Sequence, residues 1–577
     1  MRARDCSAAV AVGVALSLVL ASCSPRTAAT MEPVSRVPVT AGGTLHILRQ
    51  GPVSVWDPQR LNVGADMAFA GRVFQRTLTA WAPATRQDSL PALAPDLATD
   101  TGRAALGGKA WSFTLRNGVT WQDGKPVTCA DVKYGISRTY ATAQIVGGLT
   151  YALDFLDVPR NGDGSSTYAG PYDKTGQAAF DKAVTCVGRT IVFKLARSVP
   201  DFNQVVALSA FAPVRADEDR GARSATEIFS DGPYMLKRAW QVGKGATFVR
   251  NPQWQPTSDP IRTARPAQMI YQEGIPVETV LSRIMTSAGS DASAVTADSA
   301  PQALQNDILS NPEITARSSN PRGPFVDYLL PNFSRPTMAI PTVRRALAMA
   351  TNREAYVTAL GGTSAAEATY AMINKSLPAY RDFNPLNVPP RGDAARARTL
   401  LQASGLTLPV PITVAYRRGS PADNAMAALQ QGWQDAGFSV TLLGIEKDYF
   451  TSIASVQRSR NYDVMWAVGS AQWPSGSSVI PSLFDSRLNL SASSSGQDYG
   501  RFASPVFSAK IDAAARIPDA SRREKAWGDL DKEIAANVAA IALTNSKSVF
   551  VHGAGVTNYI DNQALSGTVD LATVSVR

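Results

Sequence analysis

The stretch WSFTLRNGVTWQDGKPV, residues 111–127, gives the clearest local indication of structure in the chain. Its first five residues alternate between apolar and polar side chains, which is typical of a half-buried β-strand. Asn117-Gly118 and Asp123-Gly124 are turn dipeptides, because both of their residue types tolerate a positive φ angle. We therefore predict a hairpin-like unit over these residues.

A helix is expected directly after this unit. Thr128 and Asp131 have the spacing of a capping box, in which each side chain accepts a hydrogen bond from the other residue's backbone N–H. The helix is predicted to run through about Thr139. It would hold Cys129 in its first turn.

Helices and strands alternate in the C-terminal half of the chain. The predicted helices are 341–350, 393–404, 422–436, 448–457 and 520–537, and the predicted strands are 412–416, 439–443, 462–468, 540–544 and 548–552. Gly43–Leu48 is predicted to be an early strand that precedes them. Regular alternation of this kind is typical of an α/β fold.

The N-terminus has the features of a secretory signal. The apolar run Ala8–Ala21 follows a short basic segment and is too short to span a bilayer, which needs about 20 apolar residues. It ends in LASC, residues 20–23, which resembles the bacterial lipobox. We expect a signal peptide over 1–22, a lipidated Cys23 and a flexible tether over 23–42. Plain signal-peptidase cleavage with Cys23 as a bystander is the alternative.

Export would place the chain in an oxidising compartment, where thiols tend to pair. Cys129 and Cys186 are the two cysteines that remain beyond Cys6 and Cys23. We expect them to form a disulfide, and closing a loop of this length stabilises a fold by roughly 4 kcal/mol. Two separate buried thiols are the alternative.

Composition argues against several classes of function. The formal net charge is +10, but no run of basic residues or recognition motif points to nucleic acid. The chain has 2 His and lacks G-x-S-x-G, H-E-x-x-H and Walker sequences, so we expect no catalysis. A metal held directly by protein side chains is not expected either, and we predict no cofactor.

Several further segments carry a family resemblance together with 111–127. They are LAPDLA at 93–98, DGPY at 231–234, RNPQW at 250–254 and VRRAL at 343–347. In this order and spacing they resemble the extracytoplasmic solute-binding proteins of the peptide and nickel type, family 5. The resemblance runs from about Gly42 to the C-terminus, and Cys129 and Cys186 sit where actinobacterial members carry paired cysteines.

The resemblance implies an α/β, two-lobed periplasmic-binding-protein-like fold of type II, cluster C, with a hinge between the lobes. Lobe I would combine 43–79, 231–325 and 541–577, with 80–230 inserted as a subdomain, and lobe II would be 326–540. A monomer would enclose its ligand between the lobes by hinge closure. The closed form would then dock on an ABC permease driven by ATPase subunits.

The resemblance also indicates residues of the ligand cleft. Peptide-binding members carry an Asp that pairs with the peptide's α-amino group, and this chain has Gln472 at that position. Because Gln cannot neutralise an ammonium group, either Asp66 takes over this task or the ligand lacks a free amine; Asp66 could equally be a surface carboxylate. The expected ligand-binding residues are Asn62, Val63, Asp66, Tyr234, Tyr416, Gly469, Ser470, Ala471, Gln472 and Trp473.

The function expected from these features is capture of di- or oligopeptides at the extracytoplasmic face of the cell membrane, for import by an ABC transporter. Relatives of this type also carry haem, metal chelates or oligosaccharides, so a non-peptide solute is one alternative. A lipoprotein that senses its ligand is another.

Overall fold

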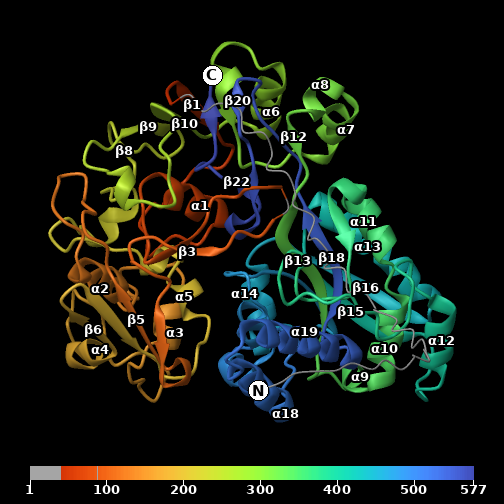
Figure 1. The fold of residues 1–577 in the computed structure, drawn as a ribbon. Coiled ribbons are helices and arrows are strands. Elements are labelled where there is room, and N and C mark those ends of the chain that lie inside the picture. Colours follow the sequence, from red (N-terminus) through yellow and green to blue (C-terminus); the bar gives the residue numbers. More distant parts are fainter. Residues whose placement is uncertain (1–40, 88) are drawn as a thin grey trace, which may run out of the picture. The chain divides into compact units, whose positions relative to one another are not determined.

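The computed structural model describes residues 41–87 and 89–577, which belong to one compact unit over residues 37–577. The predicted signal peptide, Cys23 and all but the last two residues of the predicted tether lie outside the described residues. Over the described ranges, no helix combines the length and the hydropathy needed to cross a bilayer. Sheets of five, four and six strands organise this part of the chain (Figure 1).

We call the part of the molecule around the five-stranded sheet lobe I, the part around the four-stranded sheet the subdomain, and the part around the six-stranded sheet lobe II. The strands of the five-stranded sheet are β1 (Thr44–Leu48), β8 (Tyr234–Leu236), β9 (Gly245–Arg250), β10 (Gln268–Gln272) and β11 (Ala294–Val295), in the order β11-β1-β10-β9-β8. Strand β1 is parallel to β10, with Thr44 opposite Gln268. Trp56, which is 1% exposed, packs beneath this sheet against Phe69 and Trp240 with ring centroids 5.4 and 5.1 Å away. The N-terminal segment and residues 234–295 therefore share one sheet and one core.

The chain returns to lobe I at its C-terminus. The further elements here are α1 (Gly64–Val73), α6 (Val277–Thr286), α7 (Gln302–Ser310), α8 (Pro312–Thr315), β12 (Ser318–Ser319), β19 (Phe550–Val551), β20 (Val556–Thr557), β21 (Asp561–Asn562), the 3-10 helix η8 (Gln563–Leu565), β22 (Thr568–Val569) and β23 (Ser575–Val576). Val569, Val574 and Val576 are buried in the same core as Trp56. Figure 1 shows the blue C-terminal strands beside β1.

The inserted subdomain is built on the four-stranded antiparallel sheet β4-β5-β7-β6. Its elements are β2 (Thr79–Trp81), β3 (Leu93–Pro95), β4 (Arg103–Ala105), β5 (Ala110–Thr114), α2 (Cys129–Arg138), α3 (Tyr151–Phe155), α4 (Gln177–Ala183), β6 (Val184–Val187), β7 (Thr190–Lys194) and α5 (Phe202–Val205). The predicted alternation holds in β5, where Trp111 and Phe113 are buried in the subdomain core.

The hairpin-like unit is only partly confirmed. Strand β5 pairs with β4 on one side and β7 on the other, so both of its edges are occupied and the turn at 117–118 leads away from the sheet. The second turn does close a small antiparallel contact, between Thr120 and Pro126. Gly124 adopts φ +85° there, which is the conformation that the turn dipeptide predicts.

The capped helix and the disulfide are both confirmed. Helix α2 begins after Thr128, whose side chain forms a capping box with Asp131. Cys129, in the first turn, is bonded to Cys186 in β6, with a Cα–Cα distance of 6.0 Å. The bond joins the helix of the subdomain to the edge of its sheet.

Lobe II contains the six-stranded sheet β14-β18-β13-β17-β15-β16. The strands are β13 (Arg322–Pro331), β14 (Ala366–Ala368), β15 (Val410–Arg417), β16 (Phe438–Ile445), β17 (Val464–Ser470) and β18 (Ile541–Lys547). The helices are α9 (Pro336–Ala339), α10 (Pro341–Ala350), α11 (Arg353–Leu360), α12 (Ala394–Gln402), α13 (Ser420–Asp435), α14 (Tyr449–Ala454), α15 (Val456–Ser459), α16 (Ile480–Phe484), α17 (Ser486–Asn489), α18 (Pro505–Ala515) and α19 (Ala520–Asn537). Four of the five predicted strands lie in this sheet, as β15, β16, β17 and β18, whereas 548–552 corresponds to the short strand β19 outside it. All five predicted helices are present, although 448–457 is divided into α14 and α15 at Ser455.

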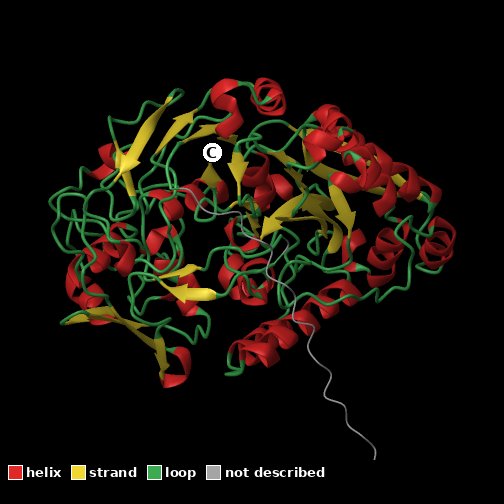
Figure 2. Ribbon diagram, turned by 45° about the horizontal axis from the view of Figure 1, so that its top comes forward, coloured by secondary structure: helices red, strands yellow, loops and turns green. Residues whose placement is uncertain are grey.

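Two separate apolar cores cover the two faces of this sheet. Leu329 of β13 packs with α10, α12 and α13, whereas its neighbours Tyr328 and Leu330 pack with α16, α18 and α19. Successive side chains of a strand point to opposite faces, so one strand serves both cores. Figure 2 shows the strands of this lobe flanked by red helices, while green loops make up much of lobe I and the subdomain.

The predicted boundary between lobe II and the C-terminal part of lobe I, after residue 540, does not coincide with the end of the six-stranded sheet. Strand β18 lies between β13 and β14 in the lobe II sheet, although residues from 541 onward were expected in lobe I. The alternation of apolar residues indicates a strand, but it does not indicate which sheet the strand joins.

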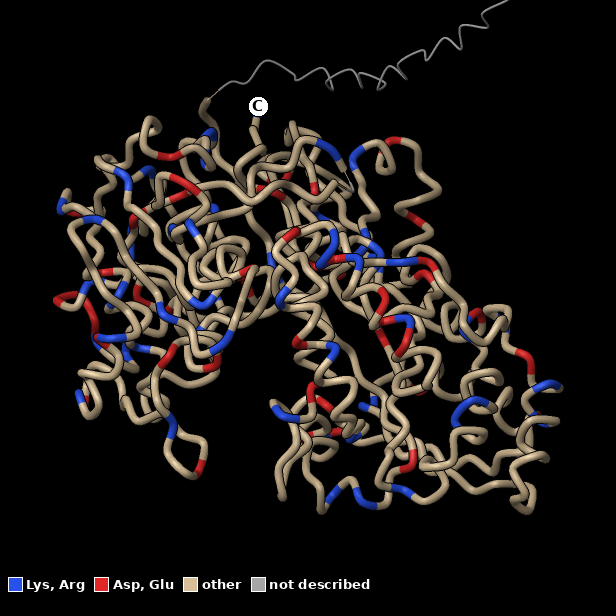
Figure 3. The backbone as a smooth tube through the Cα atoms, turned by 60° about the horizontal axis from the view of Figure 1, so that its bottom comes forward, with Lys and Arg blue, Asp and Glu red and all other residues tan. Residues whose placement is uncertain are grey.

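Charged residues of both signs are interspersed along the described chain, with no one-sided basic stripe (Figure 3).

Candidate functional site

A cavity of about 370 Å³ lies where lobe I, the subdomain and lobe II meet. Its lining comes from 62–75 and 563–566 in lobe I, from Trp81 and 207–209 in the subdomain, and from Phe325, 374–377 and 470–474 in lobe II. The segment 470–474 follows the carboxyl end of β17, which runs parallel to β15. Crevices at the carboxyl ends of parallel strands are where open α/β sheets place their ligands.

Helix α1 presents one of its faces to this cavity. Gly64, Met67, Ala68 and Gly71 line it, at the spacing that puts residues on one side of a helix. Asn62 and Val63, predicted site residues that precede the helix, also line it. Gly64 allows the close approach of η8, because a Cβ there would lie 2.2 Å from the Ser566 hydroxyl.

Asp66 lies on the opposite side of α1 and is not among the residues that line the cavity. It is 7% exposed and accepts a hydrogen bond from Arg49 at 3.1 Å, while Arg49 also pairs with Asp298 at 3.2 Å. Burial raises the pKa of the Asp66 carboxyl, although the charge of Arg49 opposes this shift. In this structure Asp66 has an arginine partner and no access to the cavity.

Four of the predicted residues follow one another along the cavity wall. Ser470, Ala471, Gln472 and Trp473 all line it, and the side chain of Gln472 has no hydrogen-bond partner within the described chain. Gly469 lines a smaller neighbouring cavity of about 30 Å³, together with Ser470 and Ala471. The amide of Gln472 is therefore available to a ligand.

Trp473 belongs to lobe II by sequence and to the subdomain by packing. It is 4% exposed and lies edge-to-face against Tyr151 and Phe155, with ring centroids 5.1 and 6.3 Å away. Its indole N–H donates to the Ser477 hydroxyl at 3.0 Å. The side chain is thus both a wall of the cavity and part of the subdomain core.

Tyr234 and Tyr416 do not line the cavity. The Tyr234 hydroxyl, in lobe I, donates to the Pro266 carbonyl at 2.7 Å, and the ring is buried in the core around Trp56. Tyr416 is 6% exposed in the helix-covered core of lobe II. Both side chains are packed within single lobes.

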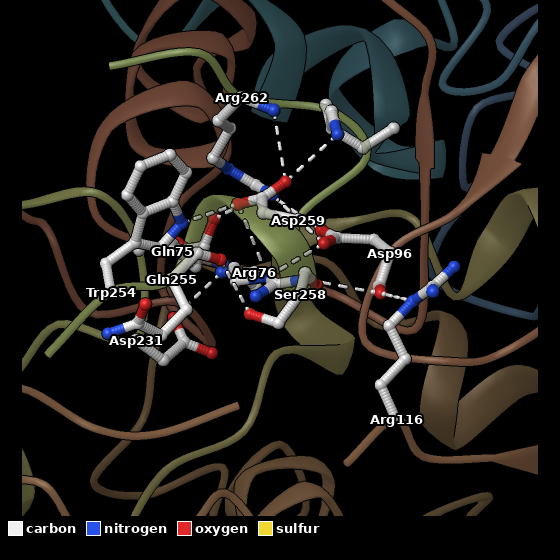
Figure 4. A network of polar contacts seen from close by, with 12 residues as sticks. Gln75, Arg76, Asp96, Arg116, Asp231, Trp254, Gln255, Ser258, Asp259 and Arg262 are labelled. Carbon is white, nitrogen blue, oxygen red and sulfur yellow. Dashed lines mark hydrogen bonds and ion pairs between the residues drawn. The ribbon is translucent and has the colours of Figure 1, made fainter. Parts of the chain in front are cut away.

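Among the residues that the structure describes, no Asp or Glu lines the cavity, and its two arginines have carboxylate partners outside it. Arg72 makes two hydrogen bonds to Asp570, at 2.8 and 3.0 Å. Arg262 pairs with Asp96 at 2.8 Å and with Asp259 at 3.2 Å (Figure 4). The charges near the wall are therefore compensated, and the groups facing a ligand are electrically neutral.

Three neutral polar groups at the cavity are buried without a partner in the described structure. They are Oε1 of Gln75, the Ser209 hydroxyl and Nε2 of Gln563. Sequence reasoning missed all three, because they come from segments far apart in the chain and none belongs to a recognisable motif. Over residues 41–87 and 89–577, no group of three or more His, Cys, Asp or Glu side chains is arranged so that it could hold a metal ion.

The known proteins that this chain resembles in sequence are bacterial binding proteins. The model of the bacterial extracellular solute-binding proteins, family 5 (middle), matches residues 92–489. The periplasmic murein peptide-binding protein MppA of Escherichia coli K12 is 23% identical over 450 residues, which cover 75% of this chain and 76% of MppA. The probable deoxycholate-binding periplasmic protein YgiS of the same organism is 23% identical over 431 residues, covering 72% and 73%.

Solved structures confirm the two-lobed α/β fold that the sequence resemblance implies. The clavulanic acid biosynthesis oligopeptide binding protein 2 superposes with a TM-score of 0.84 at 25% identity, over 93% of this chain and 96% of the other. The family match extends over more than half of the sequence, from before β3 to the end of α17. The chain therefore belongs to the bacterial extracellular solute-binding proteins of family 5.

Proposed function

We propose that this chain is the lipid-anchored, extracytoplasmic binding protein of an ABC importer. It captures peptides in the cavity between its lobes and delivers them, chemically unchanged, to a membrane permease energised by ATPase subunits. The observation that carries the proposal is the set of unpartnered neutral polar groups at Gln75, Ser209 and Gln563.

A peptide backbone supplies the hydrogen-bond partners that these groups need. The oxygen of Gln75 accepts an N–H, and the amide nitrogen of Gln563 donates to a carbonyl. A buried polar atom without a partner costs about 1–3 kcal/mol, so a ligand that pairs with it gains that amount in binding. Asn62, Val63, Ser470, Ala471 and Gln472 complete the wall, and Trp473 gives a surface for apolar ligand side chains.

The neutral lining restricts which peptides the cavity can bind. A free α-ammonium group inside the cavity would find hydrogen bonds but no carboxylate, and an uncompensated buried charge is costly. The ligand therefore has a blocked amino terminus, or keeps its amine in water. Two relatives support peptides as the class, because their names describe a murein peptide-binding and an oligopeptide-binding protein.

An amphipathic solute that lacks an ammonium group is the second candidate. Met67, Leu208 and Phe325 give the cavity apolar walls, and over 41–87 and 89–577 no acidic residue lines it to select a cation. The name of YgiS, a relative of similar identity, describes deoxycholate binding. Such a solute would be transported by the same fold and mechanism.

The direct test is native mass spectrometry of protein purified without denaturation, followed by melting-temperature measurements with peptide pools, deoxycholate, haem and nickel chelates. Peptides are expected to co-purify and to raise the melting temperature by mass action. A rise with one of the other solutes and none with any peptide pool would refute peptide capture.

Replacing Gln472 with Glu tests the neutral cavity at a single position. Compared with the wild type, the variant is expected to favour trialanine over N-acetyl-trialanine by about tenfold more, because a charge-assisted hydrogen bond is about twice as strong as a neutral one. Isothermal titration calorimetry gives the two affinities. Gln434→Glu, on the exposed side of α13, is the matched control and is expected to leave their ratio unchanged. An unchanged ratio in Gln472→Glu would show that this residue does not face the ligand.

The proposed anchor is tested at Cys23. Mass spectrometry of the membrane fraction is expected to find Cys23 acylated, and the Cys23→Ser protein is expected to leave that fraction, since two acyl chains hold a protein at a membrane more firmly than one. Retention of Cys23→Ser in the membrane fraction would contradict lipid anchoring. That outcome would leave solute capture by the cavity untouched.

A further inference from the structure

A second cavity, of about 340 Å³, lies between the inserted subdomain and lobe II. Its subdomain wall comprises Lys109, Phe155 and 196–201, and its lobe II wall comes from 473–488, α18 and α19. Trp473 lines both this cavity and the first one. We call it the basic cavity, because five Lys or Arg and three Asp side chains line it.

Two of the basic side chains are compensated. Arg487 lies between Asp485 and Asp512 and pairs with each of them at 2.8 Å. Arg523 pairs with Asp201 at 2.6 Å. These contacts account for all three acidic residues of the wall.

The other three basic side chains make no direct contact with a carboxylate of the described chain, although Asp154, Asp485 and Asp512 attract Arg197 from further away and Asp512 also attracts Arg516. Lys109, Arg197 and Arg516 make no side-chain hydrogen bond or ion pair with any residue that the structure describes. Arg197 is held in place by Phe155, with its guanidinium carbon 5.1 Å from the ring centroid. Burial lowers the pKa of Arg197, the direction expected of a desolvated cation. Lys109 and Arg197 come from the subdomain, and Arg516 comes from lobe II.

The wall also contains buried hydrogen-bond donors that lack acceptors. Nε of Arg523 and Nε1 of Trp527 are both unpartnered in the described structure. Their side chains are nine-tenths or more buried, since Arg523 is 4% and Trp527 1% exposed. Together with half-buried Arg197 and the exposed side chains of Lys109 and Arg516, which make no direct ion pair, they give the wall more donors and cations than acceptors. Phe155, Trp473 and Trp527 supply aromatic surface.

We propose that the basic cavity binds a small organic carboxylate with an apolar or aromatic body. The carboxylate would accept from the unpaired guanidinium groups, which recognise planar anions in a bidentate manner, and the body would lie against the aromatic side chains. Because Lys109 and Arg197 belong to one wall and Arg516 to the other, the bound anion links the subdomain to lobe II. This link adds to the hydrogen bonds that Asp201 of the subdomain already accepts from Ser475 and Ser477 of lobe II, at 3.0 and 2.7 Å.

The test uses 2-naphthoate as probe, its neutral isostere 2-naphthamide, and inorganic phosphate, titrated into the purified full chain by isothermal calorimetry. Naphthoate is expected to bind at least about tenfold more tightly than the amide or phosphate, and to lose affinity as salt is raised. Arg197→Gln is expected to weaken naphthoate binding by about tenfold or more, as loss of one charged hydrogen bond does. Arg238→Gln, which removes an exposed arginine in the β8–β9 loop, is expected to have no effect.

Arg516→Gln repeats the measurement from the other wall, and circular dichroism and melting temperature establish that each variant is folded. Equal affinity for naphthoate and naphthamide would overturn the proposal. So would an unchanged naphthoate affinity in folded Arg197→Gln and Arg516→Gln proteins. Phosphate binding as tight as that of naphthoate would overturn the need for an apolar body. None of these outcomes depends on what the first cavity binds.

Discussion

Replacing Arg262 with Met is expected to lower the free energy of unfolding by about 3–5 kcal/mol, the usual cost of breaking a buried ion pair from one side. Arg262 is 4% exposed and pairs with Asp96 and Asp259, both fully buried within the network of Figure 4. The substitution leaves Arg76 as the partner of two carboxylates. Although burial alone would raise it, the charges of Arg262 and Arg76 hold the pKa of Asp259 well below its ordinary value.

The same network fastens three parts of the chain together. Arg262 also donates to the backbone carbonyls of Gly71 and Gln75, at 2.8 and 3.0 Å, while Asp96 belongs to the inserted subdomain. Urea denaturation followed by circular dichroism measures the loss. Arg103→Met is the matched control: its ion pair with Asp100 is largely exposed, at 83% and 41%, so a change below about 1 kcal/mol is expected. A loss of that small size in Arg262→Met would contradict a structural role for the network.

Removing the disulfide is expected to have an effect of similar size. In the Cys129→Ala/Cys186→Ser protein the loop of 57 residues is no longer closed, and the chain-entropy model gives a loss of about 4 kcal/mol. The stability is lost in the subdomain, because the bond connects its helix α2 to its edge strand β6. Urea denaturation of the variant and the wild type, each with and without reductant, gives the measurement. Reductant is expected to destabilise the wild type alone, and equal sensitivity of both proteins would contradict this account.

The periodicity of the sequence predicts local structure well where one face of an element is buried. Helix α10 and the strands β15 and β16 appear where the apolar pattern places them, because that pattern is the cause of their burial. Strand β18 was expected in lobe I and lies in lobe II, since its partners β13 and β14 are chosen by tertiary packing.

The residues of the candidate site also divide into those that the sequence indicates and those that only tertiary packing brings together. Gln472 and Trp473 follow a strand within a recognisable segment, so the resemblance places them at the cavity. Asp66 depends on the register of α1, a helix that the sequence pattern did not reveal, and on the distant partner Arg49. Gln75, Ser209 and Gln563 converge only in the folded chain, from lobe I, the subdomain and the C-terminal segment.

The packing of Trp473 has a kinetic consequence. Any motion that separates lobe II from the subdomain must withdraw the indole from its contacts with Tyr151 and Phe155 and expose it to water. Burying a large aromatic side chain is worth about 2–3 kcal/mol, which corresponds to a factor of roughly 30 to 150 in the rate of opening when the contact is lost in the transition state. Under the proposed function, the dwell time of a captured ligand is therefore expected to depend partly on Trp473, and a smaller residue at this position is expected to speed its release.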